Sequence, residues 1–222
     1  MNVPLLDLNA QYAALKAELA PAIDEVLSSQ HFILGPVVAR FEKEMAAYCG
    51  AKHAIGCASG SDALLLALMA VGVGHGDRVL TTPFTFFATA GAIARIGARP
   101  VFVDIEPDSF NMRLDQVEET CRRHGPVKAI IPVHLYGQCV NMERLLEIGA
   151  RVGAPSIEDA AQAIGSRWGD RKAGNFGAIG CFSFFPSKNL GGWGDGGLMT
   201  TQTDALAEKL RLLRVHGSTQ KY

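Results

Sequence analysis

The stretch FSFFPSKNLGGWGDGG, residues 182–197, carries an apolar aromatic segment into a glycine-rich loop, with Lys188 at the junction. The apolar half, with the residues before it, is typical of a buried strand, and Pro186 marks its end. The glycines that follow allow the backbone to lie close to a bound molecule. A lysine that only extends into solvent needs no such surroundings, whereas a lysine that bonds covalently to a carbonyl ligand does. The stretch on its own leaves both interpretations of Lys188 open.

Short apolar segments alternate with helical segments along the whole chain. Strands are predicted at residues 53–59, 77–83, 98–105, 127–135, 154–160, 177–185 and 196–202. Helices are predicted between them or after them at residues 61–72, 86–97, 113–125, 141–153 and 204–217. Several strands lack polar alternation, which is typical of strands covered by helices on both faces. The pattern predicts an α/β fold with a mostly parallel seven-stranded sheet, whose functional loops follow the carboxyl ends of its strands.

The segment CASGSDALLLAL, residues 57–68, turns from a strand directly into a helix through Gly60 and Ser61. Ser61 is the expected N-cap of this helix, with Asp62 in its first turn. Exposed amides at a helix N-terminus, next to a glycine that permits close approach, can bind phosphate. An ordinary capped helix has the same pattern, and for this segment alone that interpretation is favoured.

Two adjacent carboxylates, Glu158 and Asp159, end a predicted strand, and Gln162 follows them. Such a pair can be catalytic, but a lone acidic pair is more often solvated or an N-cap. No histidine or further acid is spaced to complete a metal site, so none is predicted.

Aromatic and hydroxyl side chains flank the remaining loops. Phe84, Phe86 and Phe87 follow a strand, where core packing is the default and stacking on a planar ligand the alternative. Ser183 lies close to Lys188, as a serine that binds the phosphate of a carbonyl cofactor would. Each motif is weak alone, but together they supply every part that pyridoxal phosphate chemistry requires.

Five of these segments occur in an order that resembles the DegT/DnrJ/EryC1/StrS family of aminotransferases. They are SGSDALLLAL (59–68), TTPFTFFATA (81–90), IPVHLYGQ (131–138), IEDAAQAIG (157–165) and FSFFPSKNLGGWGDGG (182–197). Members of the family are fold-type I pyridoxal phosphate enzymes that act mainly on nucleotide-linked keto-sugars. The resemblance covers essentially the whole chain.

The resemblance implies a role for each candidate residue. Lys188 corresponds to the lysine that forms a Schiff base with the cofactor, and Asp159 to the carboxylate that pairs with its ring nitrogen. Gln162 corresponds to the amide near the phenolic oxygen of the cofactor, and Phe86 to the ring that stacks on it. The phosphate site corresponds to Gly60, Ser61 and Ser183. Glu158 has no counterpart in this set and is expected to be structural.

The implied reaction is transfer of an amino group from a donor, glutamate in the family, to a keto-sugar nucleotide in amino-sugar biosynthesis. Some relatives that carry histidine at the lysine position remove oxygen from the sugar, so Lys188 favours transamination. Residues 1–30 are expected to form an N-terminal arm and helix, and residues 31–222 the large cofactor-binding domain. The small C-terminal domain of the family is expected to be absent from this chain, and a homodimer is expected. The alternative is a truncated, non-catalytic domain with a structural or partner-binding role.

Composition argues against several other functions. Lys plus Arg total 21 against 22 for Asp plus Glu, so no nucleic-acid partner is predicted. We find neither a signal peptide nor an apolar stretch long enough to span a bilayer, so no membrane association is predicted. The five cysteines show no CxxC spacing, which favours a reducing, cytoplasmic location.

Overall fold

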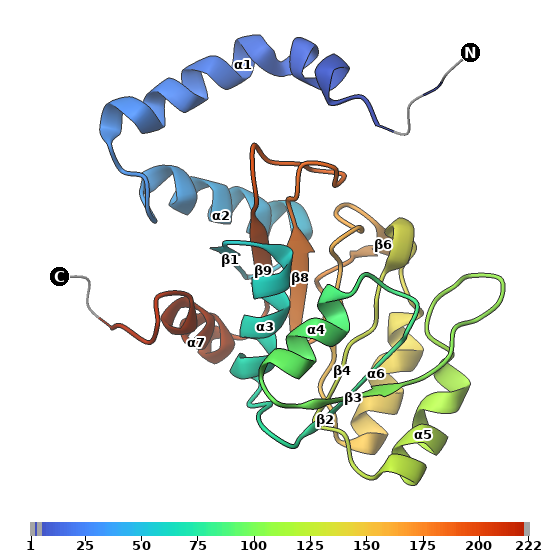
Figure 1. The fold of residues 1–222 in the computed structure, drawn as a ribbon. Coiled ribbons are helices and arrows are strands. Elements are labelled where there is room, and N and C mark those ends of the chain that lie inside the picture. The colour runs from blue at the N-terminus through green and yellow to red at the C-terminus, as the bar shows by residue number, and fades with distance from the viewer. Residues whose placement is uncertain (1–2, 4–5, 220–222) are drawn as a thin grey trace.

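The computed structural model describes residues 3 and 6–219. Its central sheet consists of a four-stranded and a three-stranded part (Figure 1). The first part has the order β1 (His53–Cys57), β9 (Gly197–Thr201), β8 (Ile179–Ser183), β5 (Ile157–Asp159), and the second β3 (Arg99–Phe102), β2 (Arg78–Thr81), β4 (Ala129–Ile130). Isolated parallel bridges from Ile130 to Ser156 and from Val133 to Asp159 join the two parts.

The direction of the strands is mixed. β2 pairs in parallel with β3 and β4, and β5 pairs in parallel with β8, whereas β9 runs antiparallel to both β1 and β8. A strand is found within each predicted range, although each is shorter than predicted. A two-stranded hairpin, β6 (Arg167–Trp168) and β7 (Arg171–Lys172), was not predicted because two-residue strands carry no readable periodicity.

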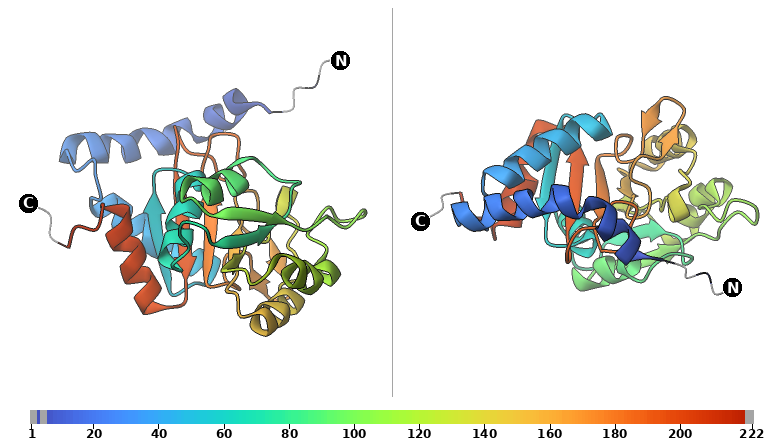
Figure 2. Two further views of the ribbon diagram at one scale, coloured as in Figure 1. Left: turned by 60° about the horizontal axis from the view of Figure 1, so that its bottom comes forward. Right: turned by 90° about the horizontal axis from the view of Figure 1, so that it is seen from above.

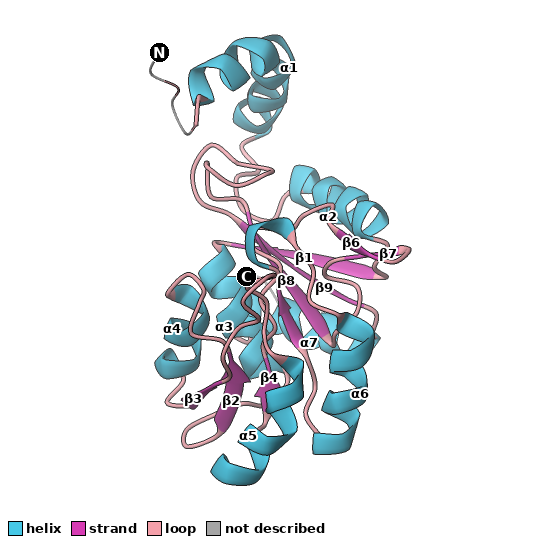
Figure 3. Ribbon diagram, turned by 90° about the vertical axis from the view of Figure 1, so that its right-hand side faces the viewer, coloured by secondary structure: helices cyan, strands magenta, loops and turns pink. Residues whose placement is uncertain are grey.

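Helices cover both faces of the sheet (Figure 3). Those of the described chain are α1 (Leu8–Ser29), α2 (Pro36–Cys49), α3 (Gly60–Ala70), α4 (Ala88–Arg95), α5 (Val117–His124), α6 (Met142–Val152) and α7 (Asp204–Arg214), with short 3₁₀ turns η1 (Leu114–Gln116) and η2 (Leu135–Gly137). Neighbouring strand residues pack on opposite faces, as Val79 against α3 and α4, and Leu80 against α5 and α6. This two-sided burial explains why the strands read as continuous apolar runs.

The N-terminal helix α1 lies along one end of the body and has no buried residue (Figures 1 and 2). Asp7 caps it by accepting a hydrogen bond from the backbone N–H of Ala10. The rings of Tyr12 and Trp193 lie 5.6 Å apart and connect α1 to the glycine-rich loop. The division into an arm at 1–30 and a large domain at 31–222 stays a prediction, and α2 was not among the predicted helices.

The described residues form neither a membrane-spanning helix nor a metal-binding cluster. None of the helices in this part of the chain has the length and apolar character needed to cross a membrane. No group of three or more His, Cys, Asp or Glu side chains in it could hold a metal ion.

Candidate active site

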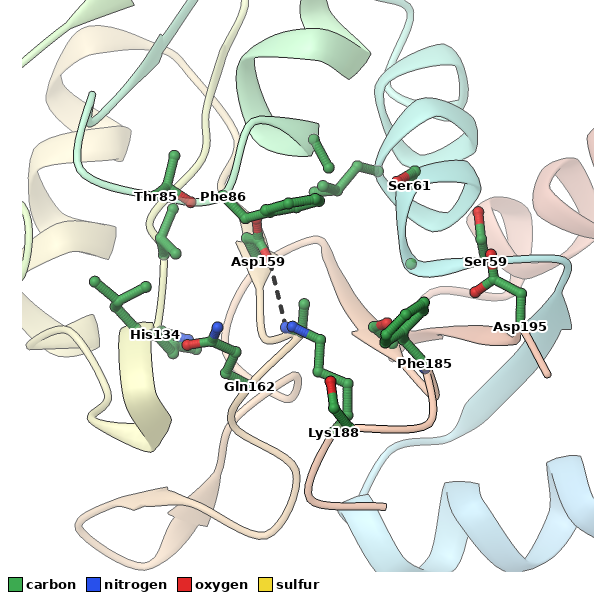
Figure 4. Close-up of a pocket in the computed structure, with 18 residues that line it drawn as sticks. Ser59, Ser61, Thr85, Phe86, His134, Asp159, Gln162, Phe185, Lys188 and Asp195 are labelled. Carbon is green, nitrogen blue, oxygen red and sulfur yellow. Dashed lines mark hydrogen bonds between the residues drawn. The ribbon is translucent and has the colours of Figure 1, made fainter. Parts of the chain in front are cut away.

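The residues singled out in the sequence come together around one cavity of about 440 Å³ (Figure 4). Its lining includes Gly60, Ser61, Phe86, Asp159, Gln162, Ser183 and Lys188. They come from the N-terminus of α3, the segment before α4, the end of β5 and the end of β8 with the loop that follows it. The cavity therefore lies where parallel strands of the sheet end, as expected for an α/β fold.

One side of the cavity is the N-terminus of α3. The N-cap is Ser59, whose hydroxyl accepts a hydrogen bond from Asp62 N–H at 3.0 Å, so the prediction that Ser61 caps this helix is wrong. The hydroxyl of Ser61, one position into the first turn, lines the cavity instead. A Cβ atom added at Gly60 would lie 2.6 Å from Cβ of Ser183, so only glycine allows the turn to approach β8 this closely. The free amides of this helix start and the Ser183 hydroxyl form a cradle for an anion.

Asp159 lies at the floor of the cavity and is 5% exposed, so the interpretation of the acidic pair as solvated or as an N-cap is wrong. One carboxylate oxygen accepts a hydrogen bond from Thr89 Oγ1 at 2.7 Å, and the other from Ala161 N–H at 3.2 Å. Burial raises the pKa of the Asp159 carboxyl, and these hydrogen bonds offset only part of the rise.

Glu158, the preceding residue, points away from the cavity because successive side chains of a strand alternate in direction. Its carboxylate is fully buried and accepts hydrogen bonds from the backbone N–H groups of Gly174, Phe176 and Gly177, each at 2.7 Å. A fourth bond, 3.0 Å long, joins it to Nε2 of His134. Burial alone would raise the pKa of Glu158, but the bond from His134 and then those from Gly177 and Gly174 hold it below its usual value.

Phe86 and Lys188 reach the cavity from opposite sides (Figure 4). The ring of Phe86 is 68% exposed and extends over the cavity (Figure 4), so core packing is the wrong interpretation for it. The other two phenylalanines of this segment are also exposed, Phe84 by 42% and Phe87 by 79%. The side chain of Lys188 extends into the cavity toward Asp159, and the backbone N–H of Lys188 donates to Phe185 O at 2.8 Å.

Residues 13–222 match the DegT/DnrJ/EryC1/StrS aminotransferase family. The chain belongs to this family. The resemblance seen in the five sequence segments is thereby confirmed, and so is the dependence on pyridoxal phosphate that the family implies. A solved structure from Bacillus subtilis, "ntda", is described with bound cofactor "pmp"; it is 32% identical, with a TM-score of 0.90 over 100% of this chain and 51% of that one.

Three further comparisons illustrate the similarity. The chain is 56% identical to a "Pleiotropic regulatory protein" of Geobacillus stearothermophilus, over 100% of this chain and 59% of the relative. It is 46% identical to the UDP-N-acetyl-3-dehydro-alpha-D-glucosamine 3-aminotransferase of Acidithiobacillus ferrooxidans, over 99% of this chain and 59% of the relative. The structure of S. venezuelae DesV in complex with a ketimine intermediate is 45% identical with a TM-score of 0.95, over 99% of this chain and 59% of that one. The chain thus spans about 59% of the length of these relatives.

Several residues of this site were not singled out in the sequence. Thr85, His134 and Asp195 also line the cavity, and Thr89 contacts Asp159 from below it. Thr85 lies in the bend before α4 and Thr89 in the first turn of that helix, so helical periodicity gave no signal for this pair. Their hydroxyl oxygens lie 2.9 Å apart.

Proposed function

We propose that this chain carries the cofactor-binding and proton-transfer machinery of an aminotransferase that moves an amino group from an amino-acid donor to a keto-sugar nucleotide. The observation that carries the proposal is the convergence of Lys188, Asp159 and the N-terminus of α3 on one cavity. Lysine at position 188, where some relatives carry histidine, favours transamination over deoxygenation of the sugar.

The donor set of the cavity fits pyridoxal phosphate. The close approach of Gly60 to Ser183 brings the amides at the start of α3 and the Ser183 hydroxyl together, and such groups bind phosphate well. Asp159 is a buried carboxyl whose neighbours on the protein side, Thr89 and Ala161, are neutral donors. A protonated ring nitrogen would supply the positive charge that this carboxyl lacks at close range.

When bound, the cofactor supplies an aldehyde that condenses with amines and a ring that accepts electrons from the breaking bond. Lys188 would hold the aldehyde covalently, and its Nζ, once displaced by the donor, would accept and return the proton of the donor α-carbon. Asp159 would keep the ring nitrogen protonated. Phe86 would pack on the ring and exclude water, and Gln162 would donate from Nε2 to the phenolic oxygen.

The proposal extends to the amino donor, the assembly and the location of the protein. Glutamate is the proposed amino donor, as the family resemblance implies. A homodimer is supported by α1, whose apolar side chains Tyr12, Leu15 and Leu27 are 41%, 39% and 51% exposed. A cytoplasmic location is supported by the cysteines at 49, 57, 121, 139 and 181, which are all free thiols.

The test is to purify the 222-residue chain with pyridoxal phosphate and record its visible absorbance beside Lys188→Ala. We expect a visible band from the parent, shifted by glutamate and missing from the control. A folded parent that stays colourless at saturating cofactor would refute cofactor binding by this chain. A band that glutamate leaves unchanged would favour the non-catalytic alternative.

A further inference from the structure

Tyr136, at the rim of the cavity, has a backbone conformation that its residue type disfavours. Its φ is 53° and its ψ 22°, within the left-handed region that a side chain with a Cβ rarely adopts. The two neighbouring residues in η2 complete a tight turn, in which Gly137 N–H donates to His134 O at 3.3 Å and Gln138 N–H donates to Leu135 O at 3.0 Å. A strained conformation at such a position calls for a compensating interaction.

The side chain of Tyr136 does not supply that interaction. It is 75% exposed, and within the described part of the chain its ring and hydroxyl make no hydrogen bond or ring contact. The compensating contact comes from the backbone, because Tyr136 N–H donates to Oε1 of Gln162 at 2.8 Å. The left-handed conformation thus directs a backbone donor at a residue that lines the cavity.

This contact decides which end of the Gln162 amide faces the cavity. A backbone N–H needs an acceptor, so the carbonyl oxygen of the amide must point at Tyr136. The NH₂ group is then left free, and no described residue accepts a hydrogen bond from it. The cavity therefore meets a hydrogen-bond donor at this point, not an acceptor.

The turn that carries Tyr136 is anchored to the interior two residues earlier. His134 is fully buried, and its Nδ1 accepts a hydrogen bond from Val140 N–H at 3.2 Å. The ring proton is therefore on Nε2, which donates to the buried Glu158 carboxylate. Because both ring nitrogens are engaged, the start of the turn is fixed, and so is the direction of the Tyr136 N–H.

We propose that Tyr136 is a positioning residue, whose left-handed backbone holds the Gln162 amide with its NH₂ group toward the phenolic oxygen of the bound cofactor. The identity of the ligand rests on the proposed function, whereas the contact between Tyr136 and Gln162 does not. It assigns the role to the backbone of Tyr136 and none to its ring. Substitutions that differ in their tolerance of positive φ therefore separate this role from one played by the ring.

The first experiment compares Tyr136→Asn with Tyr136→Val by titrating pyridoxal phosphate into each cofactor-free chain and following the visible band. Both variants remove the ring from an exposed position, but asparagine tolerates the left-handed region and a β-branched residue does not. We expect Tyr136→Asn to bind within about twofold of the parent, and Tyr136→Val about tenfold more weakly, the loss of roughly one hydrogen bond. Equal affinities for the two variants would overturn the proposal.

A double-mutant cycle tests whether Tyr136 acts through Gln162. Gln162→Ala removes the acceptor, so adding Tyr136→Val to it should weaken cofactor binding no further. A purely structural effect of Tyr136→Val would instead appear in full in both backgrounds, and that result would contradict a positioning role.

A cofactor-free measurement separates failure of this proposal from failure of the proposed function. Amide hydrogen exchange at Tyr136 should be slower in the parent and in Gln162→Glu, which keeps an acceptor, than in Gln162→Ala. If the parent binds no pyridoxal phosphate, the proposed function fails while exchange still tests the contact. Equal exchange in all three chains would overturn the positioning role.

Discussion

Replacing Glu158 with glutamine should destabilise the fold strongly. Its carboxylate accepts three backbone N–H groups at 2.7 Å and the His134 Nε2–H at 3.0 Å. Oε1 serves Phe176 and Gly177, and Oε2 serves Gly174 and His134. Glutamine keeps one acceptor oxygen and turns an NH₂ group toward two of the four donors.

The cost follows from this geometry. Two hydrogen bonds to a buried charged group are lost, each worth about 1.5–3 kcal/mol. His134 cannot relieve the conflict by moving its proton, because Nδ1 already accepts from Val140 N–H. Breaking a buried charged network by removing one partner typically costs about 3–5 kcal/mol. We therefore expect Glu158→Gln to lower the free energy of unfolding by about 3–5 kcal/mol.

Urea denaturation near pH 7, followed by circular dichroism, measures this loss. Glu118→Gln is the matched control, because the side chain of Glu118 is 38% exposed and pairs with Arg151 at the surface. An exposed pair of this kind contributes about 1 kcal/mol or less. A loss below about 1 kcal/mol for Glu158→Gln would show that the four donors find other acceptors, and would refute the reasoning.

The pH dependence gives an independent check on Glu158. Its pKa is lowered in the folded chain, so the unfolded chain binds more protons as the pH falls through the usual range of glutamate. The stabilisation is present above the unfolded pKa and is lost as pH falls through the lowered folded pKa. The parent should therefore lose more stability on acidification than Glu158→Gln, and parallel acid curves would contradict the assignment.

Three further predictions concern the cavity. Asp159→Asn should stabilise the cofactor-free chain at neutral pH, because the pKa of Asp159 is raised on folding and the stability of the parent therefore falls as pH rises through that pKa. The same substitution should weaken cofactor binding. Urea denaturation with and without pyridoxal phosphate measures both effects, and a destabilised cofactor-free variant would be the contrary result. Gly60→Ala should cost about 1–3 kcal/mol through the 2.6 Å approach of its Cβ to Ser183, whereas Gly74→Ala, with nothing within 4 Å, should be nearly neutral in the same thermal melts. Thr89→Val should raise the pKa of Asp159 further, because it removes the 2.7 Å hydrogen bond from Thr89 Oγ1, whereas Thr89→Ser keeps a hydroxyl and should not. A carboxyl NMR titration that gives both variants the same Asp159 pKa would contradict this.

Much of this architecture could be predicted from the sequence, because it depends on local patterns. The order of strands and helices follows from apolar segments and the turns between them, and Lys188 stands out through its neighbours in the chain. The residues around Phe86 alone favoured core packing, because an aromatic cluster after a strand usually packs in the core, and only the family resemblance implied a ring that faces a ligand. The N-cap was misplaced by two residues for a similar reason, since both Ser59 and Ser61 suit that position and only the backbone path distinguishes them.

The adjacent pair Glu158 and Asp159 shows most clearly what the sequence could not decide. Both carboxyls end the same strand, and strand geometry sends them to opposite sides. On one side, the turn at residues 174–177 and His134 meet Glu158 with four donors and lower its pKa; on the other, two donors leave the pKa of Asp159 raised. Except for Ala161, these donors are far from the pair in the sequence, so most of the difference arises only on folding. Glu158 is already satisfied by the protein and stabilises it, whereas Asp159 keeps a raised pKa beside two neutral donors, which fits the proposed role of pairing with a charged ring nitrogen.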